Sequence, residues 1–205
     1  MIASAPFHDG LTISCGLSLT PPVGEQIQYM QQVHGDRVVI IDHADSFEPQ
    51  ADAMVTFLTG ITLCVRVADC GNLYAYDPVA QLIGVAHSGW RGTKLNIIGK
   101  MIETMMDLWS QASDIRLRAW PAICGRCYTF WPEVVDLFDA TYYHLGDDGQ
   151  QRLDLPAIRR DQALAAWVLS EHYISSPLCS YEDPQCYSYR RNQTSQRMIG
   201  SIRLQ

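Results

Sequence analysis

Short apolar runs separated by turn residues fill the first half of the chain, and this pattern predicts β-strands. The runs are rich in β-branched and aromatic residues, and Gly, Pro, Asp or Asn stand between them. The predicted strands cover 36–42, 53–57, 62–68, 72–77 and 81–87. Two runs of similar character in the second half, 114–120 and 198–204, predict further strands.

Apolar residues recur with a helical period in the second half. Between residues 94 and 109 they form one stripe, made of Leu95, Ile98, Ile102, Met105 and Met106. Helices are therefore predicted at 94–109, 131–142 and 155–170. Pro132 suits the first turn of the second helix, and Asp154 is placed to cap the third.

Strands in the first half and helices between strands in the second predict a mixed α/β fold. No internal repeat, charge block or low-complexity linker divides the chain, so residues 1–205 are predicted to form a single domain. The order of the strands within a sheet does not follow from this pattern.

Composition argues against several classes of function. Hydrophobic residues make up 47% of the chain and charged residues 18%, which suffices for a buried core. A net charge of −7 argues against nucleic-acid binding, which needs a basic face. The apolar runs are shorter than the roughly 20 residues of a membrane span. The opening MIASAPFHDG lacks a secretory signal pattern, and the seven cysteines then predict reduced thiols and a cytoplasmic location.

Three candidate metal ligands stand at the ends of predicted strands, close to glycines. His34 lies in QQVHGD, Cys70 in VADCGN and His87 in GVAHSGWRG. Glycine lets loops approach closely, so these side chains are placed to converge. Two imidazoles and a thiolate suit Zn²⁺, and three protein ligands leave a fourth tetrahedral position open. From spacing alone, scattered His and Cys are more often packing or turn residues, and both interpretations stand at this point.

Six stretches of the chain, taken together, resemble the signature blocks of the laccase-domain family. In chain order they are QQVHGDRVV, QADAMVT, ADCGNLYAYDP, GVAHSGWRGT, PAICGRCY and SYRRNQTSQRM, and the resemblance covers roughly residues 31–204. Members of this family were first described as multicopper polyphenol oxidases and later as purine nucleoside phosphorylases. The resemblance implies an α/β sandwich of mixed β-sheets flanked by helices, with a zinc held by His34, Cys70 and His87.

The resemblance also implies a reaction, namely phosphorolysis of adenosine, inosine or guanosine and deamination of adenosine. The implied partners are a small purine nucleoside and phosphate. Phenol oxidation is disfavoured, because six histidines are fewer than the copper clusters of a multicopper oxidase require. Zinc is therefore predicted in preference to copper, and the oligomeric state does not follow from the sequence.

Candidate catalytic residues lie beside the predicted ligands. Cys70 and His87 are predicted to take part in the reaction, and Arg91 is a candidate phosphate holder because a guanidinium offers paired donors. The two arginines of SYRR, Arg190 and Arg191, are candidates for the same role. Each of these arginines equally fits a surface ion pair.

Two acidic residues have an ambiguous position. Asp69, a further candidate catalytic residue, precedes the predicted thiolate ligand, and Asp52 lies in the ADAM stretch. Either carboxylate would orient a ligating imidazole or simply cap a turn. The sequence does not choose between these roles.

Two alternatives to a nucleoside enzyme stay open. In the first, Cys70 and His87 act as the thiol nucleophile and base of an amide hydrolase, an activity associated with cell-wall precursor editing in bacterial relatives. A zinc-bound thiolate is a poor nucleophile, so this alternative excludes the metal site. In the second, the chain is a divergent, non-enzymatic zinc-binding module, which departures from the family pattern around ADC and CGRC favour.

The C-x-x-C motif of Cys124 and Cys127 is a redox or metal-binding pattern. A helix predicted after it would lower a thiol pKa. The motif lies past mid-chain, unlike that of thioredoxin-like proteins, so incidental thiols are the favoured interpretation. Cys179 and Cys186 would complete a four-cysteine zinc site only if the fold brings them there.

Overall fold

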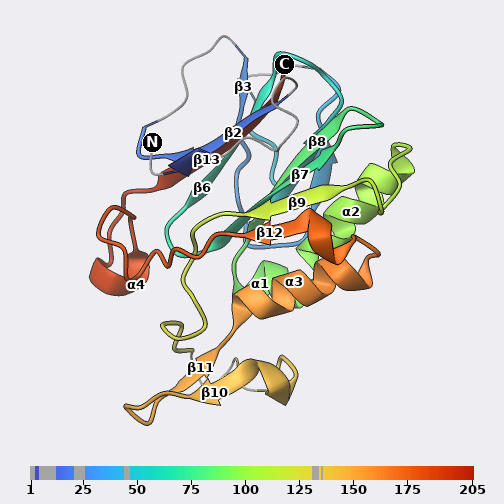
Figure 1. The fold of residues 1–205 in the computed structure, drawn as a ribbon. Helices are drawn as coiled ribbons and strands as arrows, with labels where there is room; N and C mark the ends of the chain where they lie inside the picture. The colour runs from blue at the N-terminus through green and yellow to red at the C-terminus, as the bar shows by residue number, and fades with distance from the viewer. Residues whose placement is uncertain (1–2, 5–12, 21–25, 44–46, 131–133, 135) are drawn as a thin grey trace.

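Two mixed β-sheets stack face to face, and helices cover the outer side of one of them (Figure 1). This architecture comes from a computed structural model that describes residues 3–4, 13–20, 26–43, 47–130, 134 and 136–205. It confirms the predicted fold class, an α/β sandwich of mixed β-sheets flanked by helices.

The first sheet has five strands in the order β1-β2-β13-β6-β3. Strand β13 runs antiparallel to both β2 and β6, whereas β3 runs parallel to β6. The predicted strand 198–204 is thus confirmed, and it lies in the middle of the sheet. The strand bounds are β1 (Ala3–Ser4), β2 (Ile13–Ser18), β3 (Ile27–Gln28), β6 (Thr62–Val67) and β13 (Met198–Leu204).

The second sheet has six strands in the order β12-β9-β7-β8-β5-β4. Its centre is the antiparallel hairpin of β7 and β8, and its two outer pairs, β12 with β9 and β4 with β5, are parallel. The strand bounds are β4 (Val38–Ile40), β5 (Ala53–Thr56), β7 (Gly71–Asp77), β8 (Leu82–Ser88), β9 (Arg116–Ala119) and β12 (Tyr173–Ser175).

The central strands bury both of their faces, which explains their near-continuous apolar sequences. Along β7, Tyr74 and Tyr76 point into the core between the two sheets. The alternate residues Leu73 and Ala75 point into the core beneath the helices. This alternation follows from the two-residue period of a strand.

Helices α1 (Trp90–Lys94), α2 (Ile97–Asp107) and α3 (Leu155–Ala165) pack on one side of the six-stranded sheet (Figure 1). The single helix predicted at 94–109 is wrong in one respect, because two helices meet at Asn96. That residue is left-handed, with φ of 59°, and its side chain caps α2 by accepting from the Gly99 amide. Ile98, Ile102 and Met105 are buried as predicted, whereas Leu95 and Met106 are exposed.

The helix predicted at 131–142 is also wrong within the described residues. Asp136 has a φ of 71°, which interrupts an α-helix, and between it and strand β10 the described residues form the short 3₁₀ turn η2 (Ala140–Tyr142). Residues 131–133, including Pro132, and residue 135 lie outside the described part of the chain. Strands β10 (Tyr143–Leu145) and β11 (Gln151–Leu153) form a separate hairpin, which the sequence did not predict.

The helix predicted at 155–170 begins where expected, since Asp154 accepts a hydrogen bond from the Ala157 amide at 3.0 Å. It ends early, at Ala165, because Trp167 is left-handed with φ of 69°. A 3₁₀ turn, η3 (Ser170–His172), follows, and α4 (Tyr189–Asn192) is the last short helix. No helix in the described part of the chain combines the length and apolar character that a membrane crossing requires.

Candidate metal centre

The fold brings His34, Cys70 and His87 together at one end of the six-stranded sheet. His34 lies on the loop between β3 and β4, Cys70 on the turn between β6 and β7, and His87 near the end of β8. One ligand atom from each lies within 4.8 Å of the other two. The imidazole rings of His34 and His87 meet edge to face, with centroids 4.9 Å apart.

Strand pairing explains why Cys70 and His87 meet. In the β7–β8 hairpin Asn72 is opposite His87 and Gly71 is opposite Ser88, so the turn carrying Cys70 lies beside the end of β8. Gly89 allows the Cys70 sulfur to lie close to the backbone after β8, because a Cβ atom at position 89 would be 3.1 Å from that sulfur. A larger residue there would crowd the thiolate.

His34 reaches the site through a loop that Gln32 fastens to the end of β6. The Gln32 amide donates to the Arg66 carbonyl at 2.9 Å and accepts from the Arg66 N–H at 2.8 Å. His34 itself is left-handed, with φ of 60°, an uncommon backbone conformation for a histidine. The exposed His34 ring faces the site from this loop.

Asp52 supports two of the three candidate ligands. Its carboxylate is fully buried and lies 2.8 Å from Nδ1 of His87. The same carboxylate accepts the backbone N–H groups of Val33, His34 and Gly35 at 3.2, 3.0 and 2.7 Å. With Nδ1 directed at Asp52, Nε2 of His87 is the nitrogen available to a metal. Asp52, rather than Asp69, therefore orients a candidate ligand.

The electrostatics of the site favour an ionised thiol. Burial alone raises the pKa of Cys70, but the charge of His87 and hydrogen bonds from His34 and His87 outweigh it and lower the pKa to about 6. Burial alone lowers the pKa of His87, but the Cys70 charge and the Asp52 hydrogen bond raise it to about 9. Without a metal, Cys70 and His87 thus form a thiolate–imidazolium pair at neutral pH.

Asp69 makes a different set of contacts. Its carboxylate accepts hydrogen bonds from the Ser180 hydroxyl and the Arg190 backbone N–H, each at 2.7 Å. These bonds tie the turn that carries Cys70 to two segments near the end of the chain. The contacts favour the turn-capping alternative for Asp69, and a catalytic role for it stays a prediction.

The three predicted anion-holding arginines are spread over different surroundings. The Arg91 guanidinium is exposed and lies over the Trp90 ring, 4.4 Å from its centroid. Arg190 donates to the Thr129 carbonyl and hydroxyl. Arg191 donates to the carbonyl oxygens of four residues: Ser180, Tyr181, Asp183 and Cys186. Arg191 therefore holds a loop together.

The candidate ligands open onto a cavity of about 520 Å³, a size typical of small-molecule sites. Arg66, Arg197 and Tyr189 also line it; Tyr189 and Arg197 belong to the SYRRNQTSQRM block, but neither was singled out from the sequence. Arg66 is paired with Glu48 at 2.8 Å and lies over the Tyr29 ring. Arg197 is exposed and donates only to nearby carbonyls in its described contacts. Arg91 is not among the described lining residues.

The donor set fits a zinc ion. Thiolate and imidazole are ligands that Zn²⁺ prefers, and a carboxylate behind one imidazole is a common arrangement at zinc sites. Three protein ligands on a cavity wall leave a position for water or substrate, as catalytic zinc sites do. The fold and this site together define a mixed α/β sandwich protein with an open two-histidine, one-cysteine candidate metal centre.

Comparisons with known proteins place the chain in a family. The chain belongs to the family described as multi-copper polyphenol oxidoreductase laccase, whose model matches residues 17–205. This confirms the laccase-domain resemblance that the sequence motifs carried.

Individual relatives agree with this assignment. The chain is 34% identical over 183 residues to "Purine nucleoside phosphorylase ORF3" of Streptomyces griseus, covering 86% of this chain and 73% of that protein. It is 33% identical over 178 residues to "Adenosine deaminase RL5" of an unknown prokaryotic organism, covering 78% and 68%. The crystal structure of YlmD from Geobacillus stearothermophilus superposes with a TM-score of 0.79 and 32% identity, covering 88% and 74%.

Proposed function

We propose that this protein is a zinc-dependent purine nucleoside enzyme. Its reactions would be phosphorolysis of adenosine, inosine or guanosine, and deamination of adenosine. The observation that carries this proposal is the open His34–Cys70–His87 site on the wall of a cavity of about 520 Å³. The names of relatives at 33–34% identity support the nucleoside as substrate class.

The protein's own residues prepare the site for this chemistry. When bound, zinc would supply a Lewis acid that polarises a substrate oxygen or activates a water. His34, Cys70 and His87 would hold it, and Asp52 keeps the His87 ring in the required orientation through Nδ1. Since Asp52 also accepts the His34 N–H, one buried carboxylate positions both histidines.

Other lining residues suit a nucleoside and an anion. Tyr189 is 54% exposed and lines the cavity, so its ring is available to stack on a purine. Arg197 is exposed and lines the cavity without a described carboxylate partner, which suits an incoming phosphate. Arg91 remains the sequence-based candidate for the same role, and variants of the two arginines separate them.

One observation favours a second candidate function. The thiolate–imidazolium pair of Cys70 and His87 is the activated state of a cysteine nucleophile, as an amide hydrolase requires. Zinc would occupy the same sulfur, so this activity would belong only to metal-free protein. Whether zinc is bound therefore decides between the nucleoside enzyme and the amide hydrolase.

The test uses two exposed histidines as a matched pair. Zinc-loaded wild type, His34→Ala and His43→Ala are incubated with adenosine, with and without phosphate, and the products are separated by chromatography. We expect wild type and His43→Ala to form adenine with ribose 1-phosphate when phosphate is present, and inosine with ammonia when it is absent. His34→Ala should lose both activities, since His43 lies outside the site and His34 within it.

Three outcomes contradict the proposal. Full zinc occupancy without turnover would leave the non-enzymatic zinc-binding module. Amide cleavage by metal-free protein that zinc abolishes would support the hydrolase. Oxygen consumption with a phenol, dependent on added copper, would restore the function that the family description carries.

A further inference from the structure

A second group of metal-ligating side chains lies outside the His34–Cys70–His87 site. Cys124, Cys127, Cys179 and Glu182 each offer one ligand atom, and these four atoms all lie within 4.8 Å of one another. The proposed nucleoside chemistry uses none of them. They comprise the C-x-x-C motif and two residues from a segment much later in the chain.

The backbone brings these two segments together. The N–H groups of Cys127 and Tyr128 both donate to the Cys124 carbonyl at 3.0 Å, which closes the CGRC segment into a tight turn. Ala122, just before this turn, forms a parallel bridge with Cys179 and accepts the Ser180 N–H at 3.0 Å. The cluster is therefore fixed by main-chain bonds.

Gly125 shows that the turn is also held from behind. A Cβ atom at this position would lie 2.7 Å from the Asp154 carboxyl carbon. Only glycine allows the turn to pack so closely against the residue that caps α3. The CGRC turn thus rests on the start of a helix, and its two cysteines face the 179–182 segment.

Hydrogen bonds join the candidate ligands of the two segments. The Cys124 N–H donates to the Cys179 sulfur at 3.3 Å, across a separation of 55 residues. The Cys127 thiol donates to a carboxylate oxygen of Glu182 at 3.4 Å, and this proton would leave when an ion binds. The cysteines of the cluster are free, and no disulfide joins the cysteines that the structure describes.

The spacing of the four atoms suits a tetrahedral ion. With a zinc–sulfur distance of about 2.3 Å, neighbouring sulfurs of a tetrahedral site lie about 3.8 Å apart, and a sulfur and a carboxylate oxygen about 3.5 Å. The observed limit of 4.8 Å requires two sulfurs to close by about 1.0 Å at most, and a sulfur and the carboxylate oxygen by about 1.3 Å at most. Four protein ligands leave no open position, which is typical of structural zinc.

The main competing interpretation is a redox dithiol. Such a motif relies on a helix that starts at the motif to lower a thiol pKa, and residues 128–130, which follow it directly, are not helical. A second competing interpretation is that Glu182 serves only to pair with Arg126. The Arg126 side chain is 75% exposed, however, and its nitrogen lies 3.2 Å from Glu182. An exposed pair of this kind contributes little.

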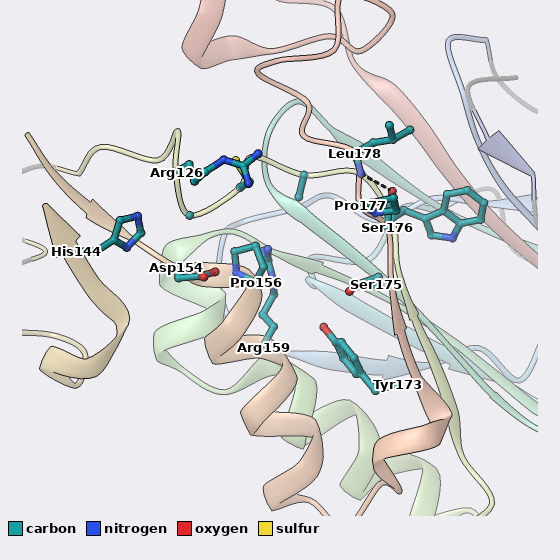
Figure 2. A pocket seen from close by; sticks show the side chains of 15 residues that line it. Arg126, His144, Asp154, Pro156, Arg159, Tyr173, Ser175, Ser176, Pro177 and Leu178 are labelled. Atoms are coloured by element: carbon teal, nitrogen blue, oxygen red, sulfur yellow. Dashed lines mark hydrogen bonds between the residues drawn. The ribbon is translucent and has the colours of Figure 1, made fainter. Parts of the chain in front are cut away.

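We propose that Cys124, Cys127, Cys179 and Glu182 bind a structural Zn²⁺ that joins the CGRC turn to the 179–182 segment. On binding, the three thiols lose their protons and become thiolate ligands, while Glu182 supplies a carboxylate oxygen. The joined segments flank a second cavity of about 230 Å³, which Arg126 and Leu178 help to line (Figure 2). The ion would therefore hold one wall of this cavity in place.

The test counts zinc in proteins that keep one site at a time. Wild type, His34→Ala, Cys127→Ser and the double variant are loaded with zinc, desalted and measured by elemental analysis. We expect two ions per chain in wild type, one in each single variant and none in the double variant. In His34→Ala, Co²⁺ should give the intense thiolate-to-metal absorption of a site with three sulfurs, and the double variant should lack that absorption.

Glu182→Gln keeps the test valid if a cysteine variant fails to fold. Glu182 is exposed, so its replacement should not unfold the chain, and Glu103→Gln on the exposed side of α2 is the matched control. In chelator competition we expect Glu182→Gln alone to release one of the two ions at a lower chelator concentration. One ion in wild type that His34→Ala loses and Cys127→Ser keeps would overturn the proposal. So would an intact mass lighter by two hydrogens, which marks a disulfide.

Discussion

At the scale of single residues, the geometry of the candidate metal centre depends most on Asp52. One buried carboxylate accepts three backbone N–H groups from the loop that carries His34 and also contacts His87. The loop that carries His34 and the strand that carries His87 are thus positioned by the same carboxylate. A change at Asp52 therefore affects both histidines at once, although Asp52 is not itself a candidate ligand.

Replacing Asp52 by Asn should weaken metal binding without removing a ligand. The Asn side chain has one acceptor oxygen, so its NH₂ group would face backbone N–H donors. We expect zinc affinity of this site to fall by about 10- to 100-fold, and the free energy of unfolding to fall by about 3 kcal/mol. Chelator competition and urea denaturation measure the two effects, with the exposed Asp107→Asn as control. Unchanged affinity would contradict the positioning role.

The same substitution should alter acid sensitivity. Burial alone raises the pKa of Asp52, but hydrogen bonds from His87 and Gly35 and the charge on His87 outweigh it and lower the pKa. A lowered folded-state pKa contributes stability above the usual aspartate value of 3.8, and this contribution is lost as pH falls below it. We expect wild type to lose stability over that range more steeply than Asp52→Asn, and parallel acid curves would refute this.

Metal binding at the same site should release a proton between pH 7 and 9. Over this range Cys70, with a pKa of about 6, is ionised, and metal-free His87, with a pKa of about 9, is protonated. Zinc requires neutral His87, so apparent affinity should rise about tenfold per pH unit and level off above pH 9. Calorimetry of Cys127→Ser in two buffers isolates this site. A pH-independent affinity would show that no such proton is held.

The residues that the sequence predicted are those with distinctive chemistry. His34, Cys70 and His87 stood out because histidine is scarce and each lies close to glycine at a strand end. Asp52 stayed ambiguous because its partner His87 is 35 positions away, beyond any local pattern. Arg66 and Arg197 were missed because their place on the cavity wall depends on how the loops pack.

At the scale of elements, local sequence predicted the positions of the two central strands, although it did not predict how they pair. The β7–β8 hairpin combines continuous apolar runs with a short turn, and its register alone brings Cys70 beside His87. The helix predicted at 131–142 failed where backbone conformation overrides periodicity, at Asp136 with φ of 71°. The spacing of apolar residues does not indicate a left-handed backbone conformation. The same spacing is therefore compatible with a helix and with the observed interruption at Asp136.

The loop of residues 180–186, which precedes α4, is held by the side chain of Arg191. Arg191 donates to four carbonyl groups, those of Ser180, Tyr181, Asp183 and Cys186. The Lys ammonium in Arg191→Lys cannot reach all of them, so we expect the free energy of unfolding to fall by about 2–3 kcal/mol. Guanidinium denaturation measures this, with the exposed Arg160→Lys as control. Equal losses in the two variants would argue against the loop-holding role.

At the scale of the whole molecule, the layers are bonded to one another. The buried Arg159 of α3 donates to the Ser88 carbonyl at the end of β8, and Gln162 donates to the Thr93 carbonyl of α1. The central strands contribute to the core on both sides of the six-stranded sheet. That residues 1–205 form a single domain, which the absence of a linker in the sequence predicted, stays a prediction.

A single domain should unfold in one cooperative step. Trp120 lies in the core between the sheets, whereas Trp90 packs against a third cluster near α3, so fluorescence reports on separate layers. We expect midpoints from tryptophan fluorescence and far-ultraviolet circular dichroism to coincide in urea at constant zinc. Two separated transitions would show that the chain contains independent units.

The central place of β13 has a consequence for synthesis on the ribosome. Met198–Leu204 separates β2 from β6, so the five-stranded sheet cannot assemble until these residues have left the exit tunnel. Until then the unpaired edges of β2 and β6 lack a partner strand that lies about 130 to 190 positions downstream, a long-range pairing of the kind that folds slowly. Nascent chains are therefore exposed to aggregation through these edges, and the turn carrying Cys70, which follows β6, gains its final support only after translation passes Leu204.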